Sequence, residues 1–384
     1  MRFEFATPMR IVFGAGTVRE VAPAAKEFGH RALVVTGRSA ERSDSLAAQL
    51  AKAGVSNCRF PVDGEPTLDI VRSGVEHARE EQCDVVVGFG GGSALDAAKA
   101  IAALLTNHGE LGDYLEVIGA GKPLANLGAP FIAIPTTAGT GTEVTRNAVL
   151  TSREHRVKVS LRSPRMLARL AVVDPELTLD LPRDVTALTG LDALTQLIEP
   201  YVCLRANPMT DGLCVEGLRR VARSLRRAFH GGHDAEARTD MSMASLLSGL
   251  ALANAGLGVV HGFAGPVGGM FPAPHGTICA ALLPCGMDVN IRALGSRASE
   301  SQSLRRYQTV ASILTGKPNA SVLDGVEWAG EICKEFGIPP LGSYGVSTEH
   351  ISALVEKASQ ASSMKANPIV LTREELHEVL ARSI

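Results

Sequence analysis

Four short apolar runs rich in β-branched residues constrain the fold of this chain more than any other feature. Each run is continuously apolar, and helix-like patterns separate one run from the next. Continuous apolar strands that alternate with helices indicate a parallel sheet covered on both faces. The sequence therefore predicts an α/β domain with strands over residues 32–36, 84–88, 131–134 and 171–173.

After about residue 181 the pattern becomes helical, with few strand signals. Apolar residues recur at helical spacing over residues 185–201, 209–229, 238–254, 303–314, 319–336 and 348–359. Pro182 stops the element before it, and Asp184 can cap the next helix. We therefore expect an α/β domain over residues 1–180 and an all-helical domain over residues 181–384.

The amino-acid composition of the chain limits the kinds of molecule that it can be expected to bind. The net charge of -2, with acidic and basic residues interspersed, gives no electrostatic footprint for nucleic acid or an anionic membrane. The seven cysteines form no CxxC pair, so we interpret them as reduced thiols that fill the core. The N-terminus lacks a signal-like apolar run, and no stretch approaches the roughly 20 apolar residues of a membrane span. We expect a cytoplasmic protein that acts on small molecules.

A glycine-rich turn follows the second predicted strand and leads into a helix. Its glycines allow close approach to phosphate oxygens, and a helix beginning at Ser93 would aim free N–H groups at them. The candidate contacts are Gly91, Gly92, Ser93 and Asp96. Ser93 and Asp96 also fit a capping box, which would explain the turn without a ligand. The turn is not GxGxxG, so the standard dinucleotide fingerprint is absent.

A second polar loop follows the third predicted strand. It contains Thr136, Thr137, Ala138, Gly139 and Thr140. Because the carboxyl ends of parallel strands share one edge of a sheet, both loops can face a single crevice. An ordinary surface loop is the alternative, since Thr and Gly are common in loops.

The helical half contains four polar residues that could share a ligand. Asp192 and Gln196 are spaced i,i+4, so both project from one face of a helix. His261 and His275 lie where helical runs are interrupted by glycine and proline. A carboxylate with imidazoles is a donor set for zinc or iron. Taken singly, each histidine could instead be a hydrogen-bonded core residue.

Motifs along nearly the whole chain resemble the iron-containing (group III) alcohol dehydrogenases. They are VFGAG, GGGSALDAAK, PTTAGTGTEVT, DALTQLIE, NAGLGVVHGFAG, APHG and SMKANP, in that order. The resemblance implies a Rossmann-like dinucleotide-binding domain, a helical domain and an active site in the cleft between them. It also implies a homodimer that transfers hydride between NAD(P)(H) and a small alcohol or aldehyde.

The resemblance assigns roles to individual residues. Gly92 and Ser93 match pyrophosphate contacts, and the residues that match dinucleotide-lining positions are Thr136, Thr137, Ala138, Gly139, Thr140 and Lys158. The four positions that match metal ligands are Asp192, Gln196, His261 and His275. Gln196 replaces the usual histidine with a poorer amide oxygen, so we expect weaker zinc or iron binding. Gly265 replaces a histidine linked to proton relay, so any relay must use another group.

The cofactor type depends on the loop after the first predicted strand. Many NAD-using relatives place an aspartate where this chain has Gly37, Arg38 and Ser39. An acidic group there would bind the ribose hydroxyl and repel a 2′-phosphate. Its absence favours NADP(H) or dual use, although Arg38 could simply be a solvated loop charge.

Other functions remain open. A maleylacetate-reductase-like enzyme would use an anionic oxo acid, and a dehydroquinate-synthase-like lyase would consume no net nicotinamide. A nucleotide-binding protein without catalysis is the third alternative. If no metal binds, His261 or His275 must act as the catalytic acid or base, which an imidazole can do near neutral pH.

Overall fold

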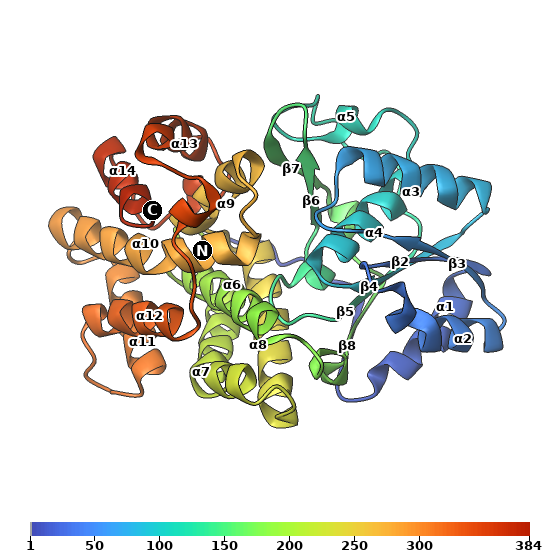
Figure 1. Ribbon diagram of the computed structural model, residues 1–384, viewed down its shortest axis with the longest axis horizontal. Helices are drawn as coiled ribbons and strands as arrows, with labels where there is room; N and C mark the ends of the chain where they lie inside the picture. The colour runs from blue at the N-terminus through green and yellow to red at the C-terminus, as the bar shows by residue number, and fades with distance from the viewer. Residues whose placement is uncertain (1) are drawn as a thin grey trace. The chain divides into compact units, whose positions relative to one another are not determined.

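The computed structural model describes residues 2–384, and its internal contacts divide the chain into two compact units. One unit is Phe5–Asp180, and the other is Leu181–Ile384 with the short segment that ends at Glu4. The first is built on a parallel sheet and the second from helices (Figure 1). The expected fold class, an α/β part followed by an all-helical part, is confirmed.

Six parallel strands form the sheet of the α/β unit. In spatial order they are β1 (Arg10–Phe13), β8 (Leu170–Val173), β5 (Phe131–Pro135), β4 (Val85–Gly90), β2 (Arg31–Thr36) and β3 (Ser56–Pro61). The four predicted strands are β2, β4, β5 and β8, which occupy the middle of the sheet. The two edge strands, β1 and β3, and an antiparallel pair, β6 (Asn147–Ser152) with β7 (Val157–Arg162), were not predicted.

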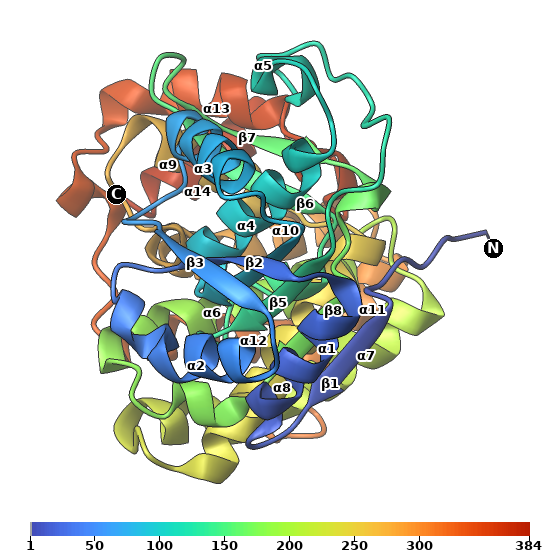
Figure 2. The same cartoon turned by 90° about the vertical axis from the view of Figure 1, so that its right-hand side faces the viewer.

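Helices cover both faces of this sheet (Figure 2). One face packs against α1 (Val21–Phe28) and α2 (Asp44–Lys52), and the other against α3 (Leu68–Glu80) and α4 (Gly92–Leu105). Successive residues of β2 alternate between the two cores, with Val34 in one and Leu33 and Val35 in the other. Because both faces are buried, each central strand needs an uninterrupted apolar run.

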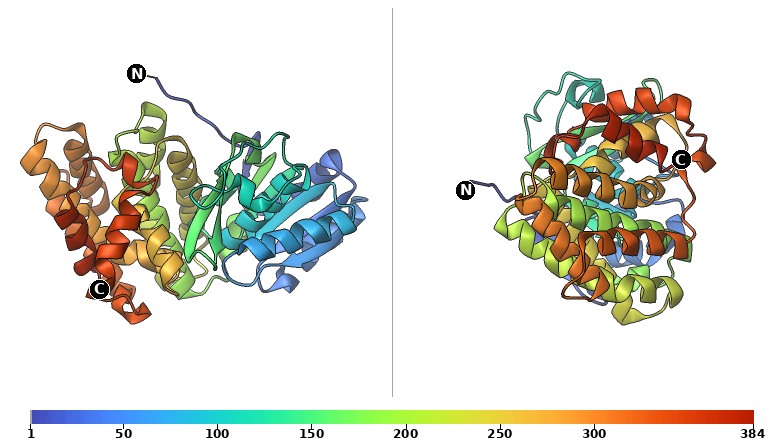
Figure 3. Two further views of the ribbon diagram at one scale, coloured as in Figure 1. Left: turned by 90° about the horizontal axis from the view of Figure 1, so that it is seen from above. Right: turned by 90° about the vertical axis from the view of Figure 1, so that its left-hand side faces the viewer.

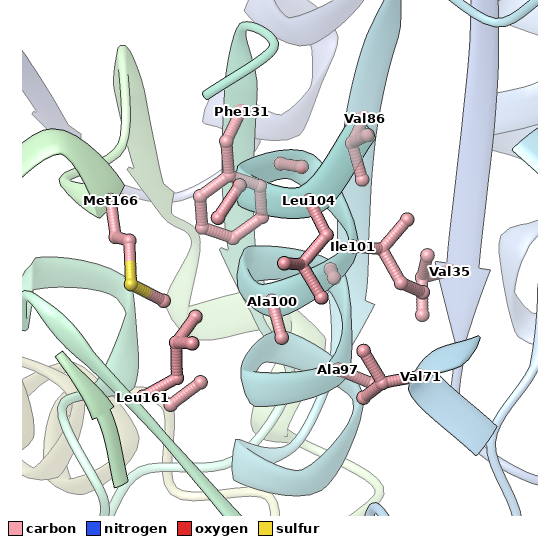
Figure 4. Packing of buried hydrophobic residues seen from close by; sticks show 14 of the residues in the cluster. Val35, Val71, Val86, Ala97, Ala100, Ile101, Leu104, Phe131, Leu161 and Met166 are labelled. Carbon is pink, nitrogen blue, oxygen red and sulfur yellow. The ribbon is translucent and has the colours of Figure 1, made fainter. Parts of the chain in front are cut away.

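Helix α4 is the central helix of one of these cores. All its residues from Ala94 to Leu104 are buried. Figure 4 shows its side chains packed against residues from several strands and helices, and the labelled residues are Val35, Val71, Val86, Ala97, Ala100, Ile101, Leu104, Phe131, Leu161 and Met166. This packing fixes the start of α4, which directly follows the glycine-rich turn. A one-turn helix, α5 (Leu111–Tyr114), follows it along the chain.

Residues 181–384 form helices and no strands in the part that the structure describes (Figure 3). The helices are α6 (Arg183–Val202), α7 (Pro208–His230), α8 (Ala235–Asn254), α9 (Val259–Met270), α10 (His275–Arg297), α11 (Gln302–Thr315), α12 (Val322–Glu335), α13 (Ile351–Ser359) and α14 (Arg373–Ala381). Helices α9, α10 and α14 were not among the predicted helical segments. Glycine and proline interrupt the pattern around His261 and His275, and α9 and α10 each contain an internal proline, Pro266 or Pro284.

Helix α10 is long and apolar enough to cross a membrane by length and composition alone, a property that the sequence analysis assigned to no stretch. Within the helical unit, however, 67% of its apolar window is buried. Helices α8 and α9 are long and apolar enough to cross a membrane only when they are taken together, and the pair is bent by 95°. The core helix of a folded protein also passes this test, so it is weak evidence for a membrane span.

Candidate active site

The loops that follow β2, β4 and β5 lie at the same edge of the sheet. In the strand register, Thr36 pairs with Phe89, and Gly90 pairs with Pro135. A Cβ atom added to Gly90 would lie only 3.2 Å from the backbone nitrogen of Gly37. The strand order also reverses here, since β3 lies on one side of β2 and β4 on the other. Ligands of open α/β sheets bind at such a reversal.

The glycine-rich turn contacts the threonine loop. A Cβ atom on Gly92 would lie 2.8 Å from Cγ2 of Thr140, and one on Gly91 would lie 3.3 Å from Cγ2 of Thr137. Helix α4 begins at Gly92, and no side chain caps it. Its first backbone N–H groups therefore lack intrahelical acceptors and can face an anion.

The capping box considered for Ser93 and Asp96 is not formed. Instead, Oδ2 of Asp96 accepts a hydrogen bond from the backbone N–H of Val149 at 3.1 Å. The carboxylate thus connects α4 to β6. The predicted capping box is wrong, because the residue at the N-cap position is Gly91, and the binding of an anion by this turn stays a prediction.

Lys99 fixes the segment that follows the threonine loop. Its buried ammonium donates to the carbonyl of Thr142 at 2.7 Å, to Oγ1 of Thr145 at 2.8 Å and to the carbonyl of Asn147 at 2.8 Å. Burial lowers the pKa of Lys99 to about 8, against the opposing effects of Asp96 and Glu143. This lysine belongs to the GGGSALDAAK motif, and no role was predicted for it.

Two of the predicted cofactor residues carry positive charge in different surroundings. Arg38 is 84% exposed, and its Nε lies 3.8 Å from Oδ2 of Asp63. Lys158, on β7, is only 6% exposed and pairs with Glu65. Gly37 has open space around it, since a Cβ atom there would meet nothing within 4 Å. Their cofactor-binding roles remain predictions.

In the helical unit, three of the predicted metal-site residues meet in one cluster. Asp192 comes from α6, His261 from the first turn of α9, and His275 is the first residue of α10. Oδ1 of Asp192 lies 3.4 Å from Nε2 of His261 and 3.6 Å from Nε2 of His275. Asp192 is 2% exposed, and its Oδ1 atom has no hydrogen-bond partner among the described residues. A buried carboxylate oxygen without a hydrogen bond, beside two imidazoles, is a suitable ligand for a cation.

A fourth member of the cluster, Cys279, was missed. Its Sγ lies 3.6 Å from Nε2 of His275 and 3.8 Å from Nε2 of His261. Ligand atoms of Asp192, His261, His275 and Cys279 all lie within 4.8 Å of one another. All seven cysteines are free thiols, but interpreting Cys279 as a simple core filler is wrong, because its sulfur faces polar groups.

The four groups of this cluster stabilise one another's charged forms. Burial works to raise the pKa of the Asp192 carboxyl, but His275 and His261 hold it well below its usual range. Burial likewise opposes protonation of His275, yet Cys279 and Asp192 raise its pKa to about 10. Burial raises the pKa of the Cys279 thiol, and the two imidazoles more than reverse that effect. Binding of a divalent cation here would release the protons that these groups carry.

Gln196 lies beside the cluster, as its i,i+4 spacing predicted, but it is engaged in hydrogen bonds. Its Nε2 donates to Oδ2 of Asp192 at 2.8 Å, and its Oε1 accepts from Oγ of Ser248 at 3.1 Å. A carboxylate can only accept, so the amide nitrogen must face Asp192. Gln196 thus donates to Asp192, and its role as a metal ligand stays a prediction.

Glu199, another residue that the sequence analysis missed, orients His261. Its Oε2 accepts from Nδ1 of His261 at 2.7 Å, and its Oε1 accepts from the backbone N–H of Val260 at 2.7 Å. This arrangement directs Nε2 of His261 toward Asp192, as outer-sphere carboxylates do at metal sites. Asn367 supports the same turn, because its Oδ1 accepts from the backbone N–H of Val259 at 3.0 Å.

Known proteins match this chain along nearly its whole length. The family described as iron-containing alcohol dehydrogenase matches residues 8–175, and the C-terminal family of Fe-containing alcohol dehydrogenases matches residues 186–384. The chain is 33% identical over 386 residues to the NAD-dependent methanol dehydrogenase of Bacillus methanolicus, with 99% of each chain covered. It is 37% identical over 390 residues to long-chain-alcohol dehydrogenase 1 of Geobacillus thermodenitrificans, covering 96% of this chain and 95% of that one.

A solved structure extends the agreement to the fold. The crystal structure of a 1,3-propanediol oxidoreductase matches this chain with a TM-score of 0.91 and 32% identity, covering 100% of both chains. The matches define an oxidoreductase that acts on CH–OH groups. The chain belongs to the iron-containing alcohol dehydrogenase family, as its motifs indicated.

Proposed function

We propose that the protein interconverts a small alcohol and its aldehyde, with NAD(P)(H) as hydride carrier and a divalent metal as cofactor. The observation that carries this proposal is the buried Oδ1 of Asp192, which has no hydrogen-bond partner among the described residues and lies beside His261, His275 and Cys279. A polar atom in such a place is costly unless a cation or another partner satisfies it. The relatives named for methanol, long-chain-alcohol and propanediol oxidation favour primary alcohols as substrates.

The metal would be held by Asp192, His261 and His275, with a fourth ligand from the same cluster. When bound, zinc or iron acts as a Lewis acid that lowers the pKa of an alcohol and favours loss of hydride. The chain supplies the orientation, since Glu199 holds His261 and Gln196 holds Asp192. The glycine-rich turn and threonine loop would hold the dinucleotide through Gly91, Gly92, Ser93, Thr136, Thr137, Ala138, Gly139 and Thr140.

The alcohol proton must reach water without the histidine that Gly265 replaces. His261 is 7% exposed, and both of its nitrogens face polar groups of the cluster. His275 has a 38% exposed side chain, so it is the imidazole of the cluster with access to solvent. Because His275 would hold the metal through Nε2, we propose that the proton leaves through water at the exposed edge of this ring and not through the imidazole itself.

The cofactor preference is tested at Gly37. We expect Gly37→Asp to shift the kcat/KM ratio toward NAD(H), because a carboxylate there would bind a ribose hydroxyl and repel a 2′-phosphate. The open space around Gly37 should accommodate this side chain without repacking. Gly37→Asn adds the same volume without charge and is the matched control. Equal ratios for all three proteins would show that this loop does not contact the ribose.

The outer-sphere role of Glu199 is tested by Glu199→Gln. A glutamine can accept from His261 or from Val260 through its single carbonyl oxygen, but not from both through oxygen. We expect zinc affinity to fall roughly 10- to 100-fold, the usual cost of losing such a partner. Glu327→Gln, at an exposed position of α12, is the control. Unchanged affinity measured by competition with a chelator would show that Glu199 has no part in holding the ligand.

A screen of alcohols and aldehydes with both nicotinamide cofactors, on protein of measured metal content, tests the proposed function. Turnover of primary alcohols and their aldehydes would support it. Preference for a dicarboxylate would favour the maleylacetate-reductase alternative instead. Product formation without net consumption of nicotinamide would favour the lyase, and cofactor binding without turnover of any substrate would favour a binding protein.

The family resemblance also leads us to propose a homodimer, and the sequence leads us to propose that it is cytoplasmic. The seven free thiols are compatible with a reducing compartment. Sedimentation of the purified protein tests the oligomeric state, and a monomer at micromolar concentration would contradict this proposal.

A further inference from the structure

We infer that Cys279 takes the place of Gln196 as the fourth metal ligand, and that the site therefore favours zinc over iron. This inference rests on the proposed function only in assuming that the cluster binds a divalent metal. A thiolate is a softer donor than an amide oxygen, and soft sulfur ligands select zinc among the available divalent ions.

The spacing of the four donor atoms fits a tetrahedral ion. Ligands at about 2.0–2.3 Å from zinc lie roughly 3.3–3.8 Å from one another in a tetrahedron. The Asp192 oxygen is 3.4 and 3.6 Å from the two imidazole Nε2 atoms. The Cys279 sulfur is 3.8 and 3.6 Å from the same two atoms. These four measured edges already match those of a zinc site.

Cys279 is also fixed in place by the helix that carries it. It lies four residues after His275 on α10, so both side chains project from one face of the helix. The residue is fully buried, with 0% exposure. Its sulfur therefore needs no rearrangement of the backbone to reach a shared ion.

Gln196 is poorly placed to compete with it. Turning its amide so that the oxygen faces the ion would break the hydrogen bond to Asp192 at 2.8 Å and the one from Ser248 at 3.1 Å. In its present orientation it donates to Oδ2 of Asp192 and leaves Oδ1 for the metal. Gln196 is thus a positioning residue.

The charge of the site points in the same direction. Asp192 with three neutral ligands would leave a divalent ion with a net charge of one in a buried site, which is costly. A Cys279 thiolate supplies the second negative charge and makes the ion and its ligands neutral. On binding, the thiol and any protonated imidazole release their protons to solvent, and no oxidant or reductant is needed.

X-ray absorption at the zinc edge tests this inference on the full-length, zinc-loaded protein. We expect one sulfur neighbour at about 2.3 Å, with the remaining nitrogen and oxygen neighbours at about 2.0–2.2 Å. Cys279→Ser should lose the sulfur neighbour and weaken zinc binding by more than about 100-fold, beyond the usual cost of losing an outer-sphere partner. Cys214→Ala, which removes another fully buried thiol of the helical unit, should keep both the sulfur neighbour and the affinity.

The Gln196→Ala variant distinguishes between Cys279 and Gln196 as the fourth metal ligand. We expect it to retain the sulfur neighbour and the coordination number, with zinc affinity reduced roughly 10- to 100-fold through loss of support for Asp192. Zinc bound by the wild type through nitrogen and oxygen alone would overturn the inference, as would wild-type affinity in Cys279→Ser. A wild-type protein that binds no zinc or iron at all would overturn the metal assignment in the proposed function as well.

Discussion

Asp192→Asn is expected to abolish stoichiometric metal binding and to lower kcat/KM by about 10³-fold or more. Asparagine has nearly the same shape, but it carries no charge to hold a cation between His261 and His275. Metal assistance contributes several kcal/mol to such reactions, and about 4 kcal/mol corresponds to a 10³-fold change in rate. Elemental analysis of the purified variant and steady-state kinetics measure the two effects.

The control for this variant is Asp184→Asn, an exposed position in the first turn of the same helix. It should leave both metal content and kinetics close to those of the wild type. Both variants should unfold cooperatively, so that loss of metal is not loss of structure. Asp192→Asn protein that keeps its metal and turns over within tenfold of the wild type would contradict the assigned role of Asp192.

Gly92→Val should lower the affinity for the dinucleotide by at least about 100-fold, or roughly 2.7 kcal/mol. A side chain here would occupy the space through which a pyrophosphate approaches the first N–H groups of α4. Its Cβ would also lie 2.8 Å from Cγ2 of Thr140. The helical unit should stay folded and keep its metal affinity. Cofactor titration followed by nicotinamide fluorescence measures the loss.

Two further variants of this chain show what causes the loss of affinity in Gly92→Val. Adding Thr140→Ser to Gly92→Val removes the methyl group nearest to the new Cβ, so restored affinity would mean that the clash, not blocked phosphate, caused the loss. Gly112→Val changes a glycine of α5 whose added Cβ would meet nothing within 4 Å, and it should bind cofactor normally. Unchanged affinity in Gly92→Val itself would remove the turn from the cofactor site.

The part of the fold that could be predicted from sequence is the part that is buried on both faces. Strands β2, β4 and β5 are continuous apolar runs because their successive side chains enter two different cores, and all four residues of β8 are likewise buried. Edge strand β3 contains Ser56, Asn57 and Arg59 and has no such run. Helices α9 and α10 were missed because glycine and proline interrupt the sequence pattern around His261 and His275, whereas in this protein both segments are helical.

Some residues of the candidate site could also be predicted from the sequence, and others could not. Asp192 and Gln196 share one helix, so their spacing alone predicted that they would meet. His261 and His275 come from different helices, and no spacing shows that their side chains converge. Family resemblance supplied that expectation. Cys279 and Glu199 carried a usable signal, since one lies a single turn after His275 and the other two turns after Asp192. The spacing of Cys279 from His275 is informative only if both residues are known to lie on one helix, which begins at His275.

Hydride transfer from a labelled alcohol tests the central claim most directly. Zinc-loaded protein is incubated with NAD⁺ or NADP⁺ and a primary alcohol that carries deuterium on its hydroxyl-bearing carbon. One deuterium should appear at C4 of each nicotinamide reduced, together with an equal amount of aldehyde, and metal-free protein should form far less of both. Reduced nicotinamide without deuterium, or alcohol consumption without net cofactor reduction, would contradict direct hydride transfer between the alcohol and the cofactor.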